Sequence, residues 1–331
     1  MWLVSSTTSI PSLLGGVATV RGGSTWDVSV DAAPSAGAGE PREGSLLVEG
    51  TSQLFYREIG GGQPVIVLHG GPDFDHSYLR PELDGLAECC RLVYYDQRGR
   101  GRSSAGVGSE QVSLDTEVED IERVRHHLVG GPVAIVGHSW GGLLAMEYAL
   151  RHSEQVSRLV LMNTAPASCN DAAYMKEQLR HRRAPRDVEE MQQLVASVEY
   201  QQGDLELDRA YHRLHFGPAF RQQDLLDELV GRLRKHFTPE GLVTARAIEQ
   251  RLYDDTWSLD GYDLVPGLRR LDTPALVIHG AHDFIPTELA RRIADAMPRG
   301  VLDVLPESGH FAYLEQPDEV RSRICGFVAS Q

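Results

Sequence analysis

Short runs of Val, Ile and Leu recur along the chain, and each stops at glycines or at a polar turn. These runs are PVIVLHGG, RLVYYDQRG, PVAIVGHSW, VSRLVLMNT, PALVIHGAHD and VLDVLPESGH. Continuous apolar runs of this length are typical of strands in a parallel sheet that is buried on both faces. Ahead of them, SLLVEGTSQLFYREIG has two strand-like runs around a Gly turn, which predicts an opening hairpin.

Segments with a helical pattern lie between these runs. Two of them are LDTEVEDIERVRHHL and GGLLAMEYALRH. The last, PDEVRSRICGFV, places Val320, Ile324, Phe327 and Val328 on one stripe after a proline at the helix start. Because strands and helices alternate, we predict a three-layer α/β sandwich with a mostly parallel sheet.

The alternation breaks between about residues 166 and 260. This stretch is charged, rich in Gln, Arg and Leu, and lacks strand-like runs. We predict that it forms several amphipathic helices inserted into a core made by residues 45–165 and 261–331. Since ligands bind at the carboxyl edge of a parallel sheet, an insertion at that edge would cover a site there. The segment 166–260 is therefore predicted to be a helical cap.

Residues 1–44 differ in composition from the rest of the chain. They are rich in Gly, Ser, Ala and Thr and end in DAAPSAGAGEPREG. Such a segment has too little apolar surface to offset its ordering entropy, so we predict that it is mostly disordered. A signal peptide is the alternative, but the first charged side chain is Arg21 and SIPSLLGGVATV is a weak apolar stretch.

Charge and cysteine usage narrow the classes of function. The chain has 47 Asp and Glu against 32 Lys and Arg, a net charge of −15, which disfavours general binding to nucleic acid or to anionic membranes. No apolar run approaches the roughly 20 residues of a membrane span. Cys89, Cys90, Cys169 and Cys325 show no C-x-x-C spacing, so neither a zinc site nor a disulfide framework is expected. We therefore predict four small buried cysteines, no metal, and a cytoplasmic protein.

The strongest chemical signal is GHSWG at residues 137–141. It fits G-x-S-x-G, and it stands between the strand-like PVAIV and the helix-like GLLAMEYAL. This context is that of a nucleophile elbow, a strained turn that projects the Ser139 hydroxyl above the sheet. Residues two before and two after the serine crowd each other there, and Gly137 and Gly141 meet that demand.

A serine nucleophile needs a base and an orienting acid, in the chain order Ser, Asp or Glu, His. Asp283 follows PALVIHG, and His310 follows VLDVL, so both fall at carboxyl ends of predicted strands. We predict the triad Ser139, Asp283 and His310. Taken singly, the histidine could be a surface residue and the aspartate a turn former. His282 and Glu307 are weaker alternatives as base and acid.

A glycine-rich turn, HGGP at residues 69–72, directly follows the run VIVL. Such a turn can aim a backbone N–H at the site, so we assign the oxyanion hole to the N–H groups of Gly71 and Trp140. His69 is expected to brace this loop through hydrogen bonds rather than to act in catalysis.

Together these motifs carry a family resemblance. From about Ser45 to its end the chain resembles the α/β-hydrolase fold. HGGP at 69–72, DQRGRGRS at 96–103 and GHSWGG at 137–142 look like the proline iminopeptidase branch, whose members typically carry H-G-G-P-G, D-Q-R-G-x-G-x-S and G-x-S-W-G. The resemblance implies a Ser-Asp-His hydrolase with a helical cap and no cofactor. One departure is Asp73, which stands where the branch usually has Gly.

The arginines of DQRGRGRS have two interpretations. Arg98, Arg100 and Arg102 could suggest phosphate binding, but no G-x-x-x-x-G-K-[ST] motif accompanies them. We expect them instead to shape a loop beside the active site and to pair with the acidic surface.

The substrate stays open at this point. Iminopeptidases of this branch use cap carboxylates to hold the free amino terminus of the substrate, and an ammonium in a dry pocket needs such a partner. Glu199 and Glu206, in VEYQQGDLELD, are the candidates here, although both could equally form the solvated face of a helix. The predicted partner is a small molecule or a short peptide, and the oligomeric state is left open.

Several functions fit these motifs. The first is an aminopeptidase that releases N-terminal Pro through a Ser139 acyl-enzyme, and the second is a carboxylesterase acting on short acyl esters. Lactone or carbon–carbon bond hydrolysis would use the same triad. A non-catalytic small-molecule receptor is the alternative from another class, since fold alone does not exclude it.

Overall fold

The structure is a computed structural model that describes residues 40–50 and 52–329. The prediction of disorder for residues 1–44 falls largely outside this range, and the first strand already begins at Arg42. Of the described residues, no helix is long and apolar enough to cross a lipid bilayer.

Eight strands form one sheet in the order β1-β2-β4-β3-β5-β6-β7-β8. The strands β1 and β2 form the predicted hairpin, and β2 pairs antiparallel with β4, whereas all pairs from β4 to β8 are parallel. The strands are β1 (Arg42–Glu49), β2 (Ser52–Gly60), β3 (Pro64–Leu68), β4 (Arg91–Tyr95), β5 (Val133–His138), β6 (Val156–Met162), β7 (Ala275–Gly280) and β8 (Gly300–Leu305).

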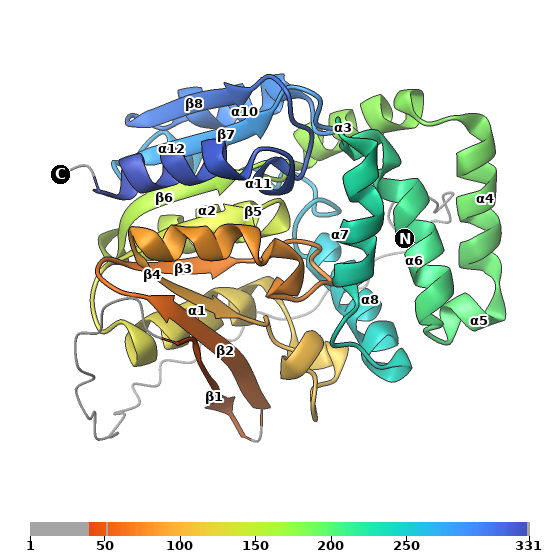
Figure 1. Ribbon diagram of the computed structural model, residues 1–331, viewed down its shortest axis with the longest axis horizontal. Helices are drawn as coiled ribbons and strands as arrows, with labels where there is room; N and C mark the ends of the chain where they lie inside the picture. The colour runs from red at the N-terminus through yellow and green to blue at the C-terminus, as the bar shows by residue number, and fades with distance from the viewer. Residues whose placement is uncertain (1–39, 51, 330–331) are drawn as a thin grey trace.

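Helices cover both faces of this sheet, as Figure 1 shows. In β3, Ile66 belongs to the apolar core shared with α1 and α2, while Val65 belongs to the core shared with η2 and α12. A strand with apolar residues on both faces thus joins two cores, and the predicted three-layer α/β sandwich is confirmed. The core helices are η1 (His76–Leu79), η2 (Glu82–Glu88), η3 (Gly101–Ser103), η4 (Ser109–Gln111), α1 (Leu114–Leu128), α2 (Trp140–Arg151), η5 (Ser153–Gln155), α9 (Val265–Leu268), α10 (Thr287–Ala296), α11 (Ala312–Glu315) and α12 (Pro317–Ala329).

Between β6 and β7 the chain, all of it described, contains helices and no strand. Before α9, which belongs to the core, these are α3 (Cys169–Arg182), α4 (Pro185–Ala196), α5 (Val198–Gln201), α6 (Leu205–Phe216), η6 (Gly217–Ala219), η7 (Gln223–Leu225), α7 (Leu226–Leu233) and α8 (Pro239–Asp254). We refer to them together as the cap. They lie to one side of the sheet in Figure 1, beyond the ends of the parallel strands.

The expectation of four small buried cysteines is wrong in two respects: only Cys90 is buried, with the other three half-buried, and two of the four are paired. Cys89 and Cys325 form a disulfide, with a Cα–Cα distance of 5.8 Å, while Cys90 is buried and unpaired. The two partners are 236 residues apart, so no sequence spacing indicates the pairing; η2 and α12 bring them together by packing on the same face of the sheet. Because disulfides persist mainly in oxidising compartments, cysteine usage no longer supports a cytoplasmic location.

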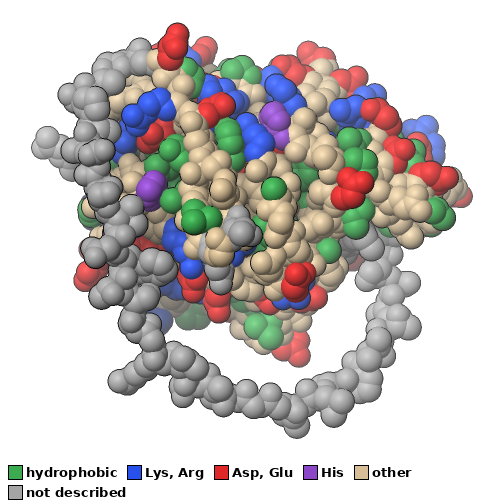
Figure 2. Space-filling model, turned by 90° about the horizontal axis from the view of Figure 1, so that it is seen from below, with side chains coloured by type: hydrophobic (Ala, Val, Ile, Leu, Met, Phe, Trp, Pro, Cys, Tyr) green, Lys and Arg blue, Asp and Glu red, His purple; other side chains and the backbone are tan. Residues whose placement is uncertain are grey.

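The charged loop at residues 96–103 is tied into the interior rather than to the surface. Arg98 lies 2.7 Å from Asp120, and Arg100 lies 2.6 Å from Glu117, with all four side chains buried. The expected pairing with the acidic surface is thus corrected: the carboxylates belong to α1. On the face drawn in Figure 2, the basic side chains that remain exposed are interspersed with acidic ones.

Candidate active site

The turn between β5 and α2 has the strained geometry predicted for a nucleophile elbow. Ser139 has φ 54° and ψ −118°, a backbone conformation that residues other than glycine rarely adopt. A Cβ atom at Gly137 would lie 2.2 Å from the carbonyl oxygen of Gly141, and one at Gly141 would lie 2.2 Å from that of Leu68. The prediction that both flanking positions must lack a side chain is confirmed.

His310 and Asp283 face each other at the carboxyl ends of β8 and β7. His310 Nδ1 lies 3.0 and 3.1 Å from the two carboxylate oxygens of Asp283, which also accept hydrogen bonds from Asn163 Nδ2 and from the Ile285 N–H. Burial opposes ionisation of Asp283, but the His310 imidazole and these bonds outweigh it and hold its pKa below the ordinary value. With Nδ1 donating to the carboxylate, Nε2 of a neutral ring is left as the acceptor. Ser139 and His310 line the same pocket, and Asp283 contacts His310.

The loop that carries His310 is held by a carboxylate that the sequence did not single out. Glu315, at the end of α11, accepts hydrogen bonds from three backbone N–H groups, those of Gly309, Arg221 and Gln222, at 2.5, 2.6 and 2.7 Å. Burial raises the pKa of Glu315 despite these donors. Two of the donors belong to the cap, so this carboxylate joins the cap to the His310 loop. By contrast Glu307, the alternative acid, is 64 % exposed at its side chain.

A chain of hydrogen bonds links the two loops on either side of Ser139. The Gly70 N–H donates to Tyr78 Oη at 2.8 Å, Tyr78 Oη lies 2.7 Å from His138 Nδ1, and His138 Nε2 lies 3.0 Å from the His310 carbonyl oxygen. Since a carbonyl can only accept, Nε2 carries the proton and Nδ1 accepts from the tyrosine. Burial lowers the pKa of His138 to about 3, which keeps its ring neutral. On the other side, the His310 N–H donates to Ala219 in the cap.

The HGGP loop runs directly beside the elbow. A Cβ at Gly70 would lie 3.0 Å from Ser139 Cβ, and Gly71, with φ 121°, lines the pocket. Trp140 is the first residue of α2, where backbone N–H groups lack partners within the helix. His69 braces the loop as expected: its Nε2 accepts from the Gln97 N–H at 3.1 Å, and burial lowers its pKa to about 3.

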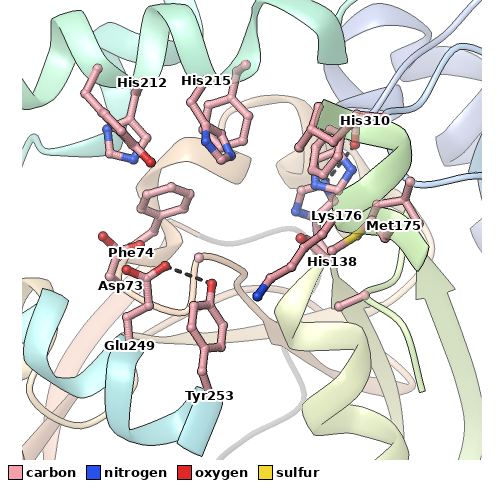
Figure 3. Close-up of a pocket in the computed structure, with 18 of the residues that line it drawn as sticks. Asp73, Phe74, His138, Met175, Lys176, His212, His215, Glu249, Tyr253 and His310 are labelled. Carbon is pink, nitrogen blue, oxygen red and sulfur yellow. Dashed lines mark hydrogen bonds between the residues drawn. The ribbon is translucent and has the colours of Figure 1, made fainter. Parts of the chain in front are cut away.

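Ser139 lines a pocket formed by residues of the core and of the cap, and Figure 3 shows this pocket. Its walls are mostly aromatic and apolar, with two carboxylates, Asp73 and Glu249, on one side and Lys176 projecting from α3. The lining residues are Gly71, Asp73, Phe74, Tyr78, His138, Ser139, Ala165, Pro166, Met175, Lys176, Leu179, Tyr200, Tyr211, His212, His215, Phe216, Arg246, Glu249, Tyr253, Trp257, Phe284, Ile285, His310 and Phe311. Burial and the nearby Asp73 raise the pKa of Glu249, which accepts a hydrogen bond from Tyr253 Oη at 2.8 Å.

The structure does not bring Glu199 and Glu206 to this pocket. Glu199 is exposed on α5, and Glu206 is 78 % exposed at its side chain, close to Arg209 in the first turns of α6. For Glu206 the reason is the rotation of α6, which turns His212 and His215 toward the cavity instead. The candidate amine-binding pair is corrected accordingly.

Asp73, the departure from the family motif, is the end of a buried ion network. Arg234 Nη2 lies 2.5 Å from Asp73, Arg234 Nε lies 2.7 Å from Asp208, and Arg246 Nη2 lies 2.5 Å from Asp208. Arg234 and Asp208 have no exposed side-chain surface. The network therefore fastens the loop after HGGP to α6, α8 and the end of α7.

Comparison with known protein families shows the family to which this chain belongs. Residues 63–317 match the alpha/beta hydrolase fold family, and the chain belongs to that family and is a hydrolase. Among the described residues, no cluster of His, Cys, Asp and Glu has the arrangement of a metal site.

Two curated relatives of this chain are proline iminopeptidases. The chain is 26 % identical over 272 residues to a proline iminopeptidase of Clostridioides difficile (strain 630), covering 81 % of this chain and 91 % of the relative. It is 29 % identical over 302 residues to a proline iminopeptidase of Heyndrickxia coagulans, covering 87 % and 99 %. Among solved structures, an esterase from Exiguobacterium antarcticum shares the fold with a TM-score of 0.61 and 24 % identity, covering 85 % of this chain and 97 % of the esterase.

Proposed function

We propose that this hydrolase is a serine aminopeptidase similar to proline iminopeptidases, which releases an N-terminal residue from a short peptide. The observation that carries the proposal is a carboxylate, Glu249, in the same mostly apolar pocket as Ser139 and His310. A pocket for an acyl ester has no need of a carboxylate there, whereas a substrate ammonium in a desolvated pocket requires one.

In the proposed mechanism, Ser139 Oγ attacks the scissile carbonyl carbon while His310 Nε2 takes its proton. The backbone N–H groups of Gly71 and Trp140 stabilise the oxyanion, and the positive end of α2 adds to this effect. His310 then returns the proton to the leaving amine, and water hydrolyses the acyl-enzyme by the same steps. Asp283, kept ionised by its low pKa, holds the imidazole tautomer and stabilises the imidazolium.

The free amino group of the substrate is assigned to Glu249, with the Asp73 carboxylate beside it. A cation between these two carboxylates would lower the pKa of Glu249 from its raised value and favour its ionised form. Aromatic rings such as Phe74 and Phe216 supply an apolar surface for a proline ring.

The test compares prolyl p-nitroanilide, its N-acetylated form and p-nitrophenyl acetate as substrates. Wild type should hydrolyse the free prolyl anilide and leave the acetylated form almost untouched. Glu249→Gln should lower kcat/KM for the prolyl anilide about 10- to 100-fold, because a charge-assisted hydrogen bond is lost. Hydrolysis of p-nitrophenyl acetate should stay within about two-fold of wild type. The matched control, Glu206→Gln, changes an exposed glutamate of the cap and should change neither activity.

Other results would point to the other functions. Equal rates on the free and acetylated anilides, or rapid ester hydrolysis alone, would favour a carboxylesterase. A fluorophosphonate probe should label wild type and not Ser139→Ala; an unlabelled wild type would favour a non-catalytic receptor.

A further inference from the structure

Lysine is rare in this chain, and one of its lysines lies in the pocket. The sequence contains 30 arginines and only two lysines, Lys176 and Lys235. Lys235 is exposed after α7, whereas Lys176 lines the same cavity as Ser139. Lys carries a compact charge with three rotatable donors, unlike the planar fork of Arg, so the two residues are not interchangeable in a binding pocket.

The orientation of α3 points Lys176 inward. Met175, Lys176 and Leu179 form the pocket side of this helix, while Tyr174 bonds to Glu288 at 2.7 Å outside the pocket. In Figure 3, the Lys176 side chain extends from α3 into the cavity, toward the wall that carries Tyr253 and Glu249. Burial lowers the pKa of Lys176 to about 8, as expected for an ammonium that has lost part of its water.

Arg246, a second cationic side chain of the pocket wall, belongs to the ion network inside the cap. Arg246 bonds to Asp208 at 2.5 Å and to the Tyr200 carbonyl oxygen at 2.6 Å, and its guanidinium lies 3.7 Å from the centre of the Tyr200 ring. Lys176 lines the pocket from α3, an element outside this network. The pocket thus presents carboxylates from α8 and the HGGP loop, and an ammonium from α3.

We propose that Lys176 binds the free C-terminal carboxylate of the substrate, so that the pocket selects very short peptides with both ends charged. This inference rests on the proposed aminopeptidase function and assigns the end of the substrate opposite its amine. An extended dipeptide spans at most about 7 Å, so both of its charged ends lie within one pocket. In a longer, extended peptide the carboxylate is displaced by up to about 3.3–3.6 Å per added residue, and the ion pair with Lys176 is lost.

The experiment uses three substrates that share an N-terminal proline: the dipeptide Pro-Gly, its C-terminal amide, and prolyl p-nitroanilide. Wild type should show a kcat/KM for Pro-Gly about 10- to 100-fold above that for Pro-Gly amide, mainly through KM. Lys176→Met should lower kcat/KM for Pro-Gly more than for Pro-Gly amide and so remove this preference, and a Tm and circular dichroism spectrum like those of wild type should show that the variant folds. Lys176→Arg should retain part of the preference, because it keeps the charge. Lys235→Met, the matched control, should behave as wild type.

The two proposals fail in different ways. If wild type hydrolyses none of the prolyl substrates, the aminopeptidase function is refuted, and the inference about Lys176 falls with it. If the anilide is hydrolysed but Pro-Gly and its amide react equally, the function stands and the role of Lys176 is refuted. The same conclusion holds if Lys176→Met lowers kcat/KM for the dipeptide and its amide by the same factor.

Discussion

Replacing Arg234 with methionine removes the positive charge at the centre of the buried ion network. The Arg234 side chain lies 2.5 Å from Asp73 and 2.7 Å from Asp208 and has no exposed surface. Methionine retains most of the aliphatic length, so the substitution chiefly deletes the charge and its hydrogen bonds. Its effect on the free energy of unfolding therefore reports on the ion network rather than on packing.

The expected loss in the free energy of unfolding depends on which ion partners Asp73 and Asp208 retain in the variant. Asp208 retains Arg246 at 2.5 Å and His212 at 3.1 Å, whereas Asp73 loses its guanidinium partner. Breaking a buried pair by removing one partner costs about 3–5 kcal/mol. Since one of the two carboxylates stays paired, we expect a loss near the lower value, about 3 kcal/mol, in urea unfolding at pH 7 with the disulfide intact.

The loss should depend on pH with a defined sign. In the wild type, burial opposes ionisation of Asp73, but Arg234 outweighs it and the pKa of Asp73 lies below 3.8. Without Arg234, burial raises that pKa above the unfolded-state value, so the folded variant takes up a proton more readily than the unfolded chain. The destabilisation is then full near pH 7 and shrinks as the pH falls toward 4.

A double-mutant cycle with Asp73 tests whether the unpaired Asp73 carboxylate causes the loss of stability in Arg234→Met. Asp73→Asn should remove most of the penalty of Arg234→Met, because no buried charge is left without a partner. A penalty below about 1 kcal/mol, or one that is independent of pH and of residue 73, would refute this account of the network.

Two further predictions concern the scaffold of the site. Glu315→Gln should lower kcat about 10- to 100-fold with little change in KM, because the His310 loop loses the carboxylate that holds it in place. Glu307→Gln changes an exposed glutamate nearby and is the control in the same assay. Equal effects of the two substitutions would contradict the role of Glu315 in holding this loop. Gly141→Ala places a Cβ 2.2 Å from the Leu68 carbonyl oxygen and should sharply lower Tm, whereas Gly231→Ala, in α7 with nothing within 4 Å, should leave Tm unchanged or raise it slightly. Similar Tm values for the two glycine variants would show that the close approach at the elbow can relax.

The fold and the chemistry of the core follow from local signals. Each strand is a short apolar run, and GHSWG stands between a strand and a helix, so the position of Ser139 depends on neighbours in the sequence. Asp283 and His310 lie far from it along the chain, but both end parallel strands, and the carboxyl ends of parallel strands meet at one edge. That rule suffices to predict their meeting.

Which residues of the cap face the cavity could not be predicted in the same way. Which side of a cap helix faces the cavity depends on how helices pack against one another, and Glu199 and Glu206 look no different in sequence from Glu249. A signal did exist: Glu249 lies in α8 next to Ile248, which is completely buried, so its position adjoins the apolar stripe of that helix. The disulfide depended on a tertiary contact over 236 residues and left no local signal.

The contacts at residues 217–222 limit how this enzyme can admit and release ligands. Here the cap packs directly against the loop that carries His310. The Ala219 carbonyl oxygen accepts a hydrogen bond from the His310 N–H, and a Cβ at Gly309 would lie only 2.0 Å from that oxygen. An outward movement of this stretch would also displace His310, the proposed general base, relative to Ser139. We therefore expect substrate entry and product release to require movement of the cap helices that precede residue 217, while residues 217–222 stay in contact with the His310 loop.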